Sequence, residues 1–341
     1  MKPERTPEEK LWAKRTNAAV MMAMGAVFTA CALAAGLIAL RPGALPSWMS
    51  GAWRRRGEAP LRTARPVLVR FQAFGPAAFA RARAERKLVL LHLTTAWSTR
   101  GREVEEETYG DPKTAAWLES AFVLTRADAE ARPDLAARYG VGSWPATVLF
   151  AADGKAVAAA MGLPPALLRP WAEQVIAVLK AHPEREPAMA ADAESRFSAV
   201  RALPPRDPAS YAMDPVWGGV YHEQGEYAKL LADQAAVVAS TDAVRARAAL
   251  RFAQSFLALP GGGWAASMAG EADLRGGRVA QGPYYFSLKD AARRALGLPA
   301  VDRRFLPGPN ALMARAVLKS PVATPAEKAR ARAALRRAAA R

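Results

Sequence analysis

A short apolar run followed by the pentapeptide Trp97-Ser98-Thr99-Arg100-Gly101 sets the framework of this sequence. The run, residues 87–93, is apolar except for Lys87 and His92, and it is too short for a helix of typical length. It therefore predicts a buried strand. A charged helical pattern follows at residues 102–107. The pentapeptide is thus predicted to join a strand to a helix.

Further elements follow in a regular order. Residues 121–124 predict a second strand, 134–139 a short helix, and 142–150 a segment that leads into a third strand. Asp153-Gly154 lies between two apolar runs and signals a hairpin. A final helix over residues 167–179 carries its apolar side chains at helical spacing, which indicates a face packed on a core.

These residues carry a family resemblance. The span from about Phe71 to about Leu163 resembles the thioredoxin fold, in the branch with a W-C-x-x-C motif, an acidic helix and a D-P turn. The matching residues here are Trp97–Gly101, Glu107-Thr108-Tyr109 and Asp111-Pro112. The chain is most similar to the thioredoxin-domain family of YyaL or spermatogenesis-associated-protein-20 type. That resemblance implies an α/β thioredoxin-like domain followed by an α/α helical barrel.

The motif departs from the family at the residues that carry its chemistry. Aligned on Glu107, the first cysteine position of the family falls at Ser98 and the second at Gly101. Thiol–disulfide exchange needs one thiolate to attack and a second thiol to resolve the mixed disulfide. The only cysteine, Cys31, lies in an apolar run far from the motif. We therefore expect no redox catalysis and no cofactor.

Other catalytic chemistries find little support. A serine nucleophile at Ser98 would need an adjacent base, and the three histidines, at positions 92, 182 and 222, show no pairing in sequence. Scattered histidines without usable cysteines also give no metal-ligand spacing. The chain is accordingly expected not to be an enzyme and to bind no metal.

Pro145 stands where the family has its cis-proline, beside the redox motif. In thioredoxins that loop presents backbone to an extended partner. The vestigial motif positions and the proline loop therefore define a possible binding groove, formed by Trp97, Ser98, Gly101, Trp144 and Pro145. The alternative is that the proline only preserves the fold, and the sequence leaves both open.

The N-terminal region predicts a membrane tether. Residues 1–17 form a polar tail, and residues 18–40 are an uncharged run of 23 residues. At 1.5 Å per residue this run spans roughly 34 Å, enough to cross a bilayer core. A cleaved signal peptide is the alternative, although such apolar cores are usually shorter. Small residues at every fourth position, Ala26, Ala30 and Ala34, would let another helix approach closely.

Residues 41–66 are rich in Pro and Gly and predict a linker at the membrane surface. Its interfacial residues are expected to be Trp48, Trp53, Arg54, Arg55 and Arg56, with anionic lipid headgroups as their contacts. A basic N-terminus before the first span would leave the soluble domains in the periplasm of a bacterial inner membrane. The arginine triplet supports the opposite orientation.

Charge alone allows several partners. The net charge is +17, which suits nucleic acid, anionic lipid or an acidic protein. The membrane tether and the lack of a reading motif argue against nucleic acid.

After the thioredoxin-like domain, residues 67–182, the remainder, 183–341, resembles the helical half of the same family. The resemblance rests on motifs beginning at Asp214, Tyr227, Gly262, Tyr284 and Asn310. The family barrel continues well past that asparagine, so a truncated barrel is expected. Thr324-Pro325-Ala326-Glu327 predicts a capping box for one further helix. From Arg315 to Arg341 eight basic residues face Glu327 alone.

Together these features predict a membrane-anchored, redox-inactive accessory subunit of an integral membrane protein complex, respiratory or photosynthetic. A membrane-bound chaperone or assembly factor that holds extended clients beside Pro145 is the alternative. An enzyme using Glu271 and Asp273 in the helical half is a third hypothesis.

Overall fold

The computed structural model describes residues 61–141, 144–202, 206–222 and 226–340. The predicted tail, membrane span and surface linker up to residue 60 lie outside the described residues. They include Ala26, Ala30, Ala34, Trp48, Trp53 and the arginine triplet at 54–56. In the part that is described, no helix is long and apolar enough to cross a membrane.

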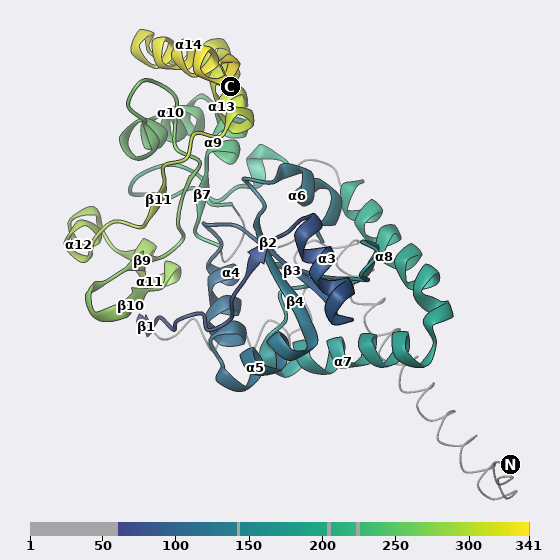
Figure 1. Cartoon of the computed structure of the whole chain (residues 1–341). Helices are drawn as coiled ribbons and strands as arrows, with labels where there is room; N and C mark the ends of the chain where they lie inside the picture. Colours follow the sequence, from purple (N-terminus) through teal and green to yellow (C-terminus); the bar gives the residue numbers. More distant parts are fainter. Residues whose placement is uncertain (1–60, 142–143, 203–205, 223–225, 341) are drawn as a thin grey trace, which may run out of the picture. The chain divides into compact units, whose positions relative to one another are not determined.

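The thioredoxin-like part is built on a mixed five-stranded sheet with the order β2-β4-β3-β5-β6 (Figure 1). Strand β4 runs parallel to both β2 and β3, whereas β5 is antiparallel to β3 and β6 is antiparallel to β5. The strands are β2 (Gln72–Ala73), β3 (Leu88–Thr94), β4 (Phe122–Asp128), β5 (Ala146–Phe150) and β6 (Ala156–Met161).

Helices cover both faces of this sheet because alternate residues of its strands point to opposite sides. Val89, Leu91 and Leu93 of β3 pack in one core with α3 (Pro76–Glu85), α6 (Pro133–Tyr139) and α8 (Glu186–Arg201). Leu90 and Leu124 pack in a second core with α5 (Pro112–Ala121) and α7 (Pro165–Ala181). Strand β3 is therefore apolar except for His92 and Thr94, as the sequence predicts for a buried strand.

The helix expected over residues 102–107 begins earlier in the chain, and its C-terminal turn is π-helical. It comprises α4 (Thr99–Val104) followed by one π-helical turn, Glu105–Tyr109. This turn carries Glu105 toward His92 on β3, where the His92 Nε2 lies 3.2 Å from a carboxylate oxygen of Glu105. Burial lowers the pKa of His92 below its ordinary value.

Two segments lie outside the domain limits expected from the sequence. Helix α8 follows a 3₁₀ turn at Pro183–Arg185, beyond the expected boundary at residue 182, yet its Ala193 and Phe197 are buried in the thioredoxin-like core. Strand β1 (Leu61–Thr63), in the expected linker, pairs with β10 of the helical part. The chain thus touches the helical part before it enters the thioredoxin-like sheet.

The helical part combines helices with two small three-stranded sheets, ordered β1-β10-β9 and β11-β8-β7. Its helices are α9 (Leu231–Val238), α10 (Ala243–Phe252), α11 (Gly282–Ser287), α12 (Asp290–Leu296), α13 (Pro307–Lys319) and α14 (Pro325–Ala339). A π-helical turn, Ala253–Leu257, extends α10, and 3₁₀ turns lie at Pro208–Ser210 and Arg275–Gly277. Its strands are β7 (Lys229–Leu230), β8 (Ser267–Met268), β9 (Ala272–Asp273), β10 (Arg278–Ala280) and β11 (Val301–Asp302).

The predicted capping box is confirmed at the start of α14. The Thr324 hydroxyl accepts from the Glu327 backbone N–H, and the Glu327 carboxylate accepts from the Thr324 N–H at 2.8 Å. Two backbone donors without intrahelical partners are satisfied reciprocally. The truncated α/α barrel remains a prediction from the resemblance.

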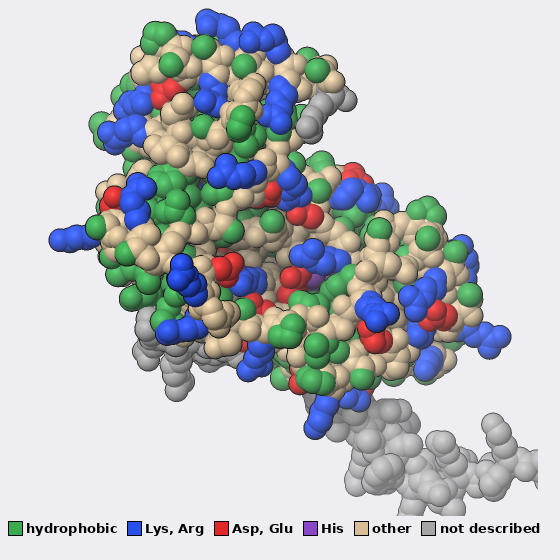
Figure 2. Space-filling model, turned by 60° about the vertical axis from the view of Figure 1, so that its left-hand side comes forward, with side chains coloured by type: hydrophobic (Ala, Val, Ile, Leu, Met, Phe, Trp, Pro, Cys, Tyr) green, Lys and Arg blue, Asp and Glu red, His purple; other side chains and the backbone are tan. Residues whose placement is uncertain are grey.

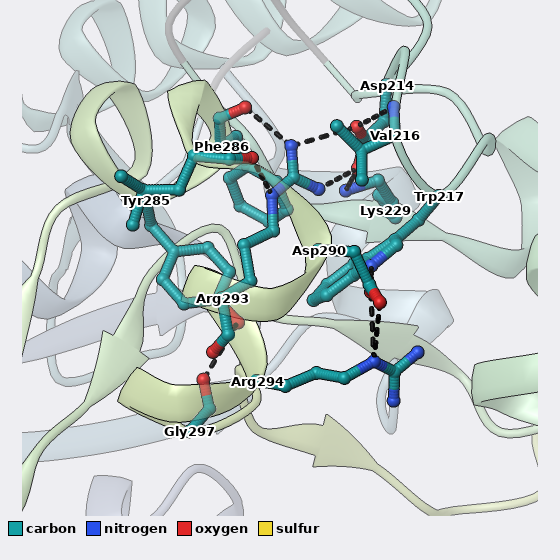
Figure 3. A network of polar contacts seen from close by, with 11 residues as sticks. Asp214, Val216, Trp217, Lys229, Tyr285, Phe286, Asp290, Arg293, Arg294 and Gly297 are labelled. Atoms are coloured by element: carbon teal, nitrogen blue, oxygen red, sulfur yellow. Dashed lines mark hydrogen bonds and ion pairs between the residues drawn. The ribbon is translucent and has the colours of Figure 1, made fainter.

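A buried charge network ties the helical part together (Figure 3). The Asp214 carboxylate accepts from two guanidinium nitrogens of Arg293, at 2.7 and 3.1 Å, and lies 3.2 Å from the Lys229 ammonium. The Lys229 ammonium also lies 3.7 Å from the Phe286 ring centroid. Burial lowers the pKa of Lys229 to about 7. The single Asp214 carboxylate thus pairs with two buried cations, Arg293 and Lys229, and the Phe286 ring face provides a further contact for the ammonium.

Candidate functional site

Ser98 begins helix α4 at the end of the turn that follows β3. Its backbone is extended, with φ −72° and ψ 112°, and its hydroxyl accepts from the Gly101 N–H at 2.9 Å. Ser98 and Trp97 are each only 4% exposed. The residue at the family's first cysteine position therefore acts as an N-cap, and its hydroxyl faces the interior.

Glu226, from the helical part, supplies a carboxylate to this helix start. One oxygen lies 3.1 Å from the Ser98 hydroxyl and 3.0 Å from the Arg100 N–H, and the other accepts from the Thr99 N–H at 3.1 Å. The first backbone N–H groups of a helix have no intrahelical acceptors, and the positive end of the helix dipole favours a negative charge there. Glu226 meets both needs from 126 to 128 positions away in sequence.

The segment around Glu226 also covers Trp97. The His222 ring meets the Trp97 indole edge-on, with ring centroids 4.6 Å apart. Ala228 and Leu230 also pack against Trp97, and Trp144 borders this cluster. Asp233 orients His222 by accepting from its Nδ1 at 2.8 Å, and Tyr211 donates to the same carboxylate at 2.9 Å. The face of the vestigial motif is therefore occupied by the chain's own helical part.

Pro145 lies beside the motif, as the resemblance predicts. The Trp144–Pro145 peptide bond is cis, and the Pro145 carbonyl accepts from the Gly162 N–H at 2.6 Å. A Cβ at Gly162 would lie 2.6 Å from the Pro145 ring, so this approach requires glycine. The five predicted site residues, Trp97, Ser98, Gly101, Trp144 and Pro145, lie in this region of the thioredoxin-like part.

Two arginines flank this contact and reach across it in opposite directions. Arg102 of α4 donates to Asp273 at 2.6 Å and pairs with Glu271 at 3.2 Å, both in the helical part. Arg304, from the helical part, donates to Asp128 at the end of β4 at 2.8 Å. Opposite charges raise the pKa of both guanidinium groups above the ordinary value.

Glu130 lies beside the second arginine in an acidic surrounding. It is largely buried, and its carboxylate is 3.8 Å from Arg304. Burial, and then the negative charges of Asp128 and Asp302, raise the pKa of Glu130 to about 7. This contact region therefore contains a carboxyl group that can change its charge near neutral pH.

The third hypothesis placed Glu271 and Asp273 at an active site. The Glu271 side chain is 2% exposed and is paired with Arg102, and Asp273 is bonded to the same guanidinium. Among the residues that the structure describes, no group of His, Cys, Asp and Glu side chains is arranged to hold a metal ion. Each histidine lies near a carboxylate in space, at Glu105, Glu184 and Asp233.

Sequence reasoning missed the residues that occupy the motif, above all Glu226 and His222. Nothing near them in sequence marks them, because their partners lie in the other half of the chain. The start of any helix needs acceptors for its first backbone N–H groups, but the sequence does not indicate which side chain supplies them.

A family model matches the thioredoxin-like part of the chain. Residues 59–200 match the family model Thioredox_DsbH, described as a protein of unknown function, DUF255. The thioredoxin-like part is therefore similar to this family. The match extends through α8, in agreement with the packing of that helix on the sheet. The closer likeness to the YyaL type remains an expectation, and no curated protein matches the sequence.

Several solved structures are similar to part of this chain. A thioredoxin from Thermus thermophilus is 23% identical, with 33% of this chain and 89% of that chain covered and a TM-score of 0.30. A disulphide isomerase from Xylella fastidiosa is 20% identical, covering 28% and 82%, with a TM-score of 0.24. A DsbH oxidoreductase is 19% identical, covering 37% and 98%, with a TM-score of 0.28.

Proposed function

We propose that this chain is a redox-inactive, membrane-anchored thioredoxin-like protein that serves as an accessory subunit of a larger membrane complex. The observation that carries the proposal is the Glu226 carboxylate on Ser98, Thr99 and Arg100. The face that would carry exchange chemistry in a thioredoxin here joins two parts of one chain. Such a joint favours a structural role.

The lack of thiols supports the same proposal. Exchange would require two sulfurs at the motif, and the positions that match them are Ser98 and Gly101. A Cβ at Gly101 would collide with the Thr94 hydroxyl, so the local packing is adapted to glycine. The membrane anchor in this proposal is residues 18–40, and the linker at 41–66 would lie on anionic lipid.

The chaperone hypothesis is less well supported by these contacts. An extended client beside Pro145 would have to displace Ala228 and Leu230 from Trp97 and leave the α4 amides without Glu226. An enzyme that uses Glu271 would likewise have to break its pair with Arg102.

The test is the behaviour of the protein in its native membrane. Membranes are extracted with a mild detergent, separated by size, and the fractions that contain this chain are analysed by mass spectrometry. Migration with one large assembly at a constant ratio supports the accessory-subunit proposal. Migration alone, or with a changing set of proteins, would contradict it.

A further inference from the structure

A shallow apolar groove runs between helices α9 and α13 of the helical part. Its volume is about 400 Å³. The α9 side contributes Ala232 and Ala236, one turn apart, and the α13 side contributes Leu312, Arg315 and Lys319. Leu312 is 49% exposed at the groove although it is a large apolar residue. The groove is therefore concave, apolar and lined on α9 by small side chains, which allow a helix backbone to approach closely.

Basic side chains predominate around this groove, and the exposed Asp242, two residues after the lining residue Ser240, accepts from the Arg245 N–H at 3.0 Å. Arg315 and Lys319 are exposed on α13, and Arg332 and Arg336 are exposed on α14. Figure 2 shows Lys and Arg side chains gathered over the end of the molecule that carries α14.

The carboxylates of these three helices do not offset that charge. Asp233 of α9 is buried and bonded to Tyr211 and His222. Glu327 of α14 is buried and paired with both terminal nitrogens of Arg247, at 2.8 and 2.9 Å. An occupant of the groove would therefore meet exposed cations and no exposed carboxylate from α9, α13 or α14.

We propose that this groove binds an acidic amphipathic helix of another subunit in the membrane complex. Apolar side chains of that helix would lie against Ala232, Ala236 and Leu312, and its carboxylates would pair with Arg315 and Lys319. Helix-in-groove recognition has this form, with anchors on one helical face and charges at the rim. The inference rests on the accessory-subunit proposal and adds the chemistry of the partner and its place of binding.

Two other occupants match either the shape or the charge of the groove less well. An anionic lipid surface is flat and would contact the basic side chains of α13 and α14 without entering the concave space. Residues 1–60 of this chain include an apolar run but carry several basic residues of their own, which fit a basic rim poorly. An acidic helix satisfies both the shape and the charge.

Site-specific photo-cross-linking in the native membrane tests the occupant. A photoreactive amino acid replaces Leu312 in the groove, and in a matched variant it replaces Leu335, which is 37% exposed on α14. Cross-links from position 312, and not from position 335, to an acidic helix of a subunit that co-purifies at constant ratio would support the proposal. Cross-links from position 312 to lipid or to residues 1–60 would overturn it.

Charge reversal gives a second measurement. The double variant Arg315→Glu/Lys319→Glu is expected to lower the amount of co-purified subunit at least tenfold. The control Arg332→Glu/Arg336→Glu, with the same charge change outside the groove, should retain it. Equal retention by both variants would overturn the groove while leaving the accessory-subunit proposal standing. Failure of the wild-type chain to co-purify with any assembly would overturn both.

Discussion

Glu226 joins the two halves of the chain at the motif. Its carboxylate accepts two backbone N–H groups and one hydroxyl, all within 3.1 Å. Hydrogen bonds to a charged group that is partly shielded from water contribute more to stability than neutral ones, because the donors would otherwise be desolvated without an acceptor.

Glu226→Gln should therefore lower the free energy of unfolding by about 1 to 3 kcal/mol. Chemical denaturation followed by circular dichroism measures this value. The control is Glu173→Gln, which breaks an exposed pair with Arg169 and should change stability by less than about 0.5 kcal/mol. Equal losses of stability in the two variants would contradict the view that Glu226 holds the two halves together.

Glu130 gives the contact region a dependence on pH. Its pKa rises from 4.5 to about 7 in the folded chain, so between these values the folded state binds a proton that the unfolded state has released. The stability contributed by this proton is fully present below pH 4.5 and is lost as the pH rises through 7.

Glu130→Gln should remove this loss. As the pH rises from 5 to 8, the denaturation midpoint of the wild-type protein should decrease relative to that of the variant. At pH 8 the variant should be the more stable of the two. Denaturation series at pH 5, 6, 7 and 8 provide the measurement. Two parallel curves would contradict the assigned titration.

At this scale the sequence predicted the residues near the motif and missed those that bind to it. Trp97, Ser98 and Pro145 stand in a local pattern that a family resemblance can recognise. Glu226 resembles any acidic residue in a polar loop, and only the folded chain brings it to the start of α4. Contacts that join distant segments leave no periodic trace in the sequence.

Helix α8 illustrates the same limit for an element. The sequence suggested a boundary before it, because the run His182–Pro187 is polar and contains two prolines. The helix is also rich in alanine and charge, so no apolar stripe marks its inner face. Yet Phe197 is fully buried and meets the Tyr139 ring edge-on, with centroids 5.5 Å apart.

Phe197→Ala should consequently destabilise the thioredoxin-like part by about 3 to 5 kcal/mol, since a large buried ring would leave a cavity. Thermal and chemical unfolding of the wild-type protein and of the variant measure the difference in their free energies of unfolding. Leu167→Ala on α7 is the comparison, because Leu167 is 57% exposed and should cost less than about 0.5 kcal/mol. A small effect at Phe197 would mean that α8 is not part of this core.

Elements with local signals were predicted well. Strands β3 and β5 appeared as apolar runs, and the start of α14 was marked by its capping box, whose two hydrogen bonds lie within four consecutive residues. The family motif that begins at Tyr227 is helical only from Leu231, because Lys229 and Leu230 form strand β7 and pair with β8.

The whole molecule depends on contacts between its two halves. Arg102 reaches from the thioredoxin-like part to Asp273, and Arg304 reaches back to Asp128. Glu226 likewise reaches from the helical part to the start of α4. Charged side chains of each half therefore bind partners in the other half. The motif therefore lies inside the contact between the two halves. Its reactivity depends on whether another molecule can reach it as well as on which residues it contains.

A single sulfur placed at the motif tests this view of the molecule. In a Cys31→Ser background, Ser98→Cys should react with a thiol reagent at least a hundredfold more slowly than Ser120→Cys, because Ser98 is 4% exposed and Ser120 is exposed. The neighbouring Glu226 carboxylate would also raise the pKa of the new thiol, which reduces its reactive thiolate form. Adding Glu226→Ala should speed the reaction at position 98 by loosening the joint and leave position 120 unchanged. Similar rates at positions 98 and 120 without that change would mean that the motif is open in solution, and the groove beside Pro145 would again be free to bind an extended partner.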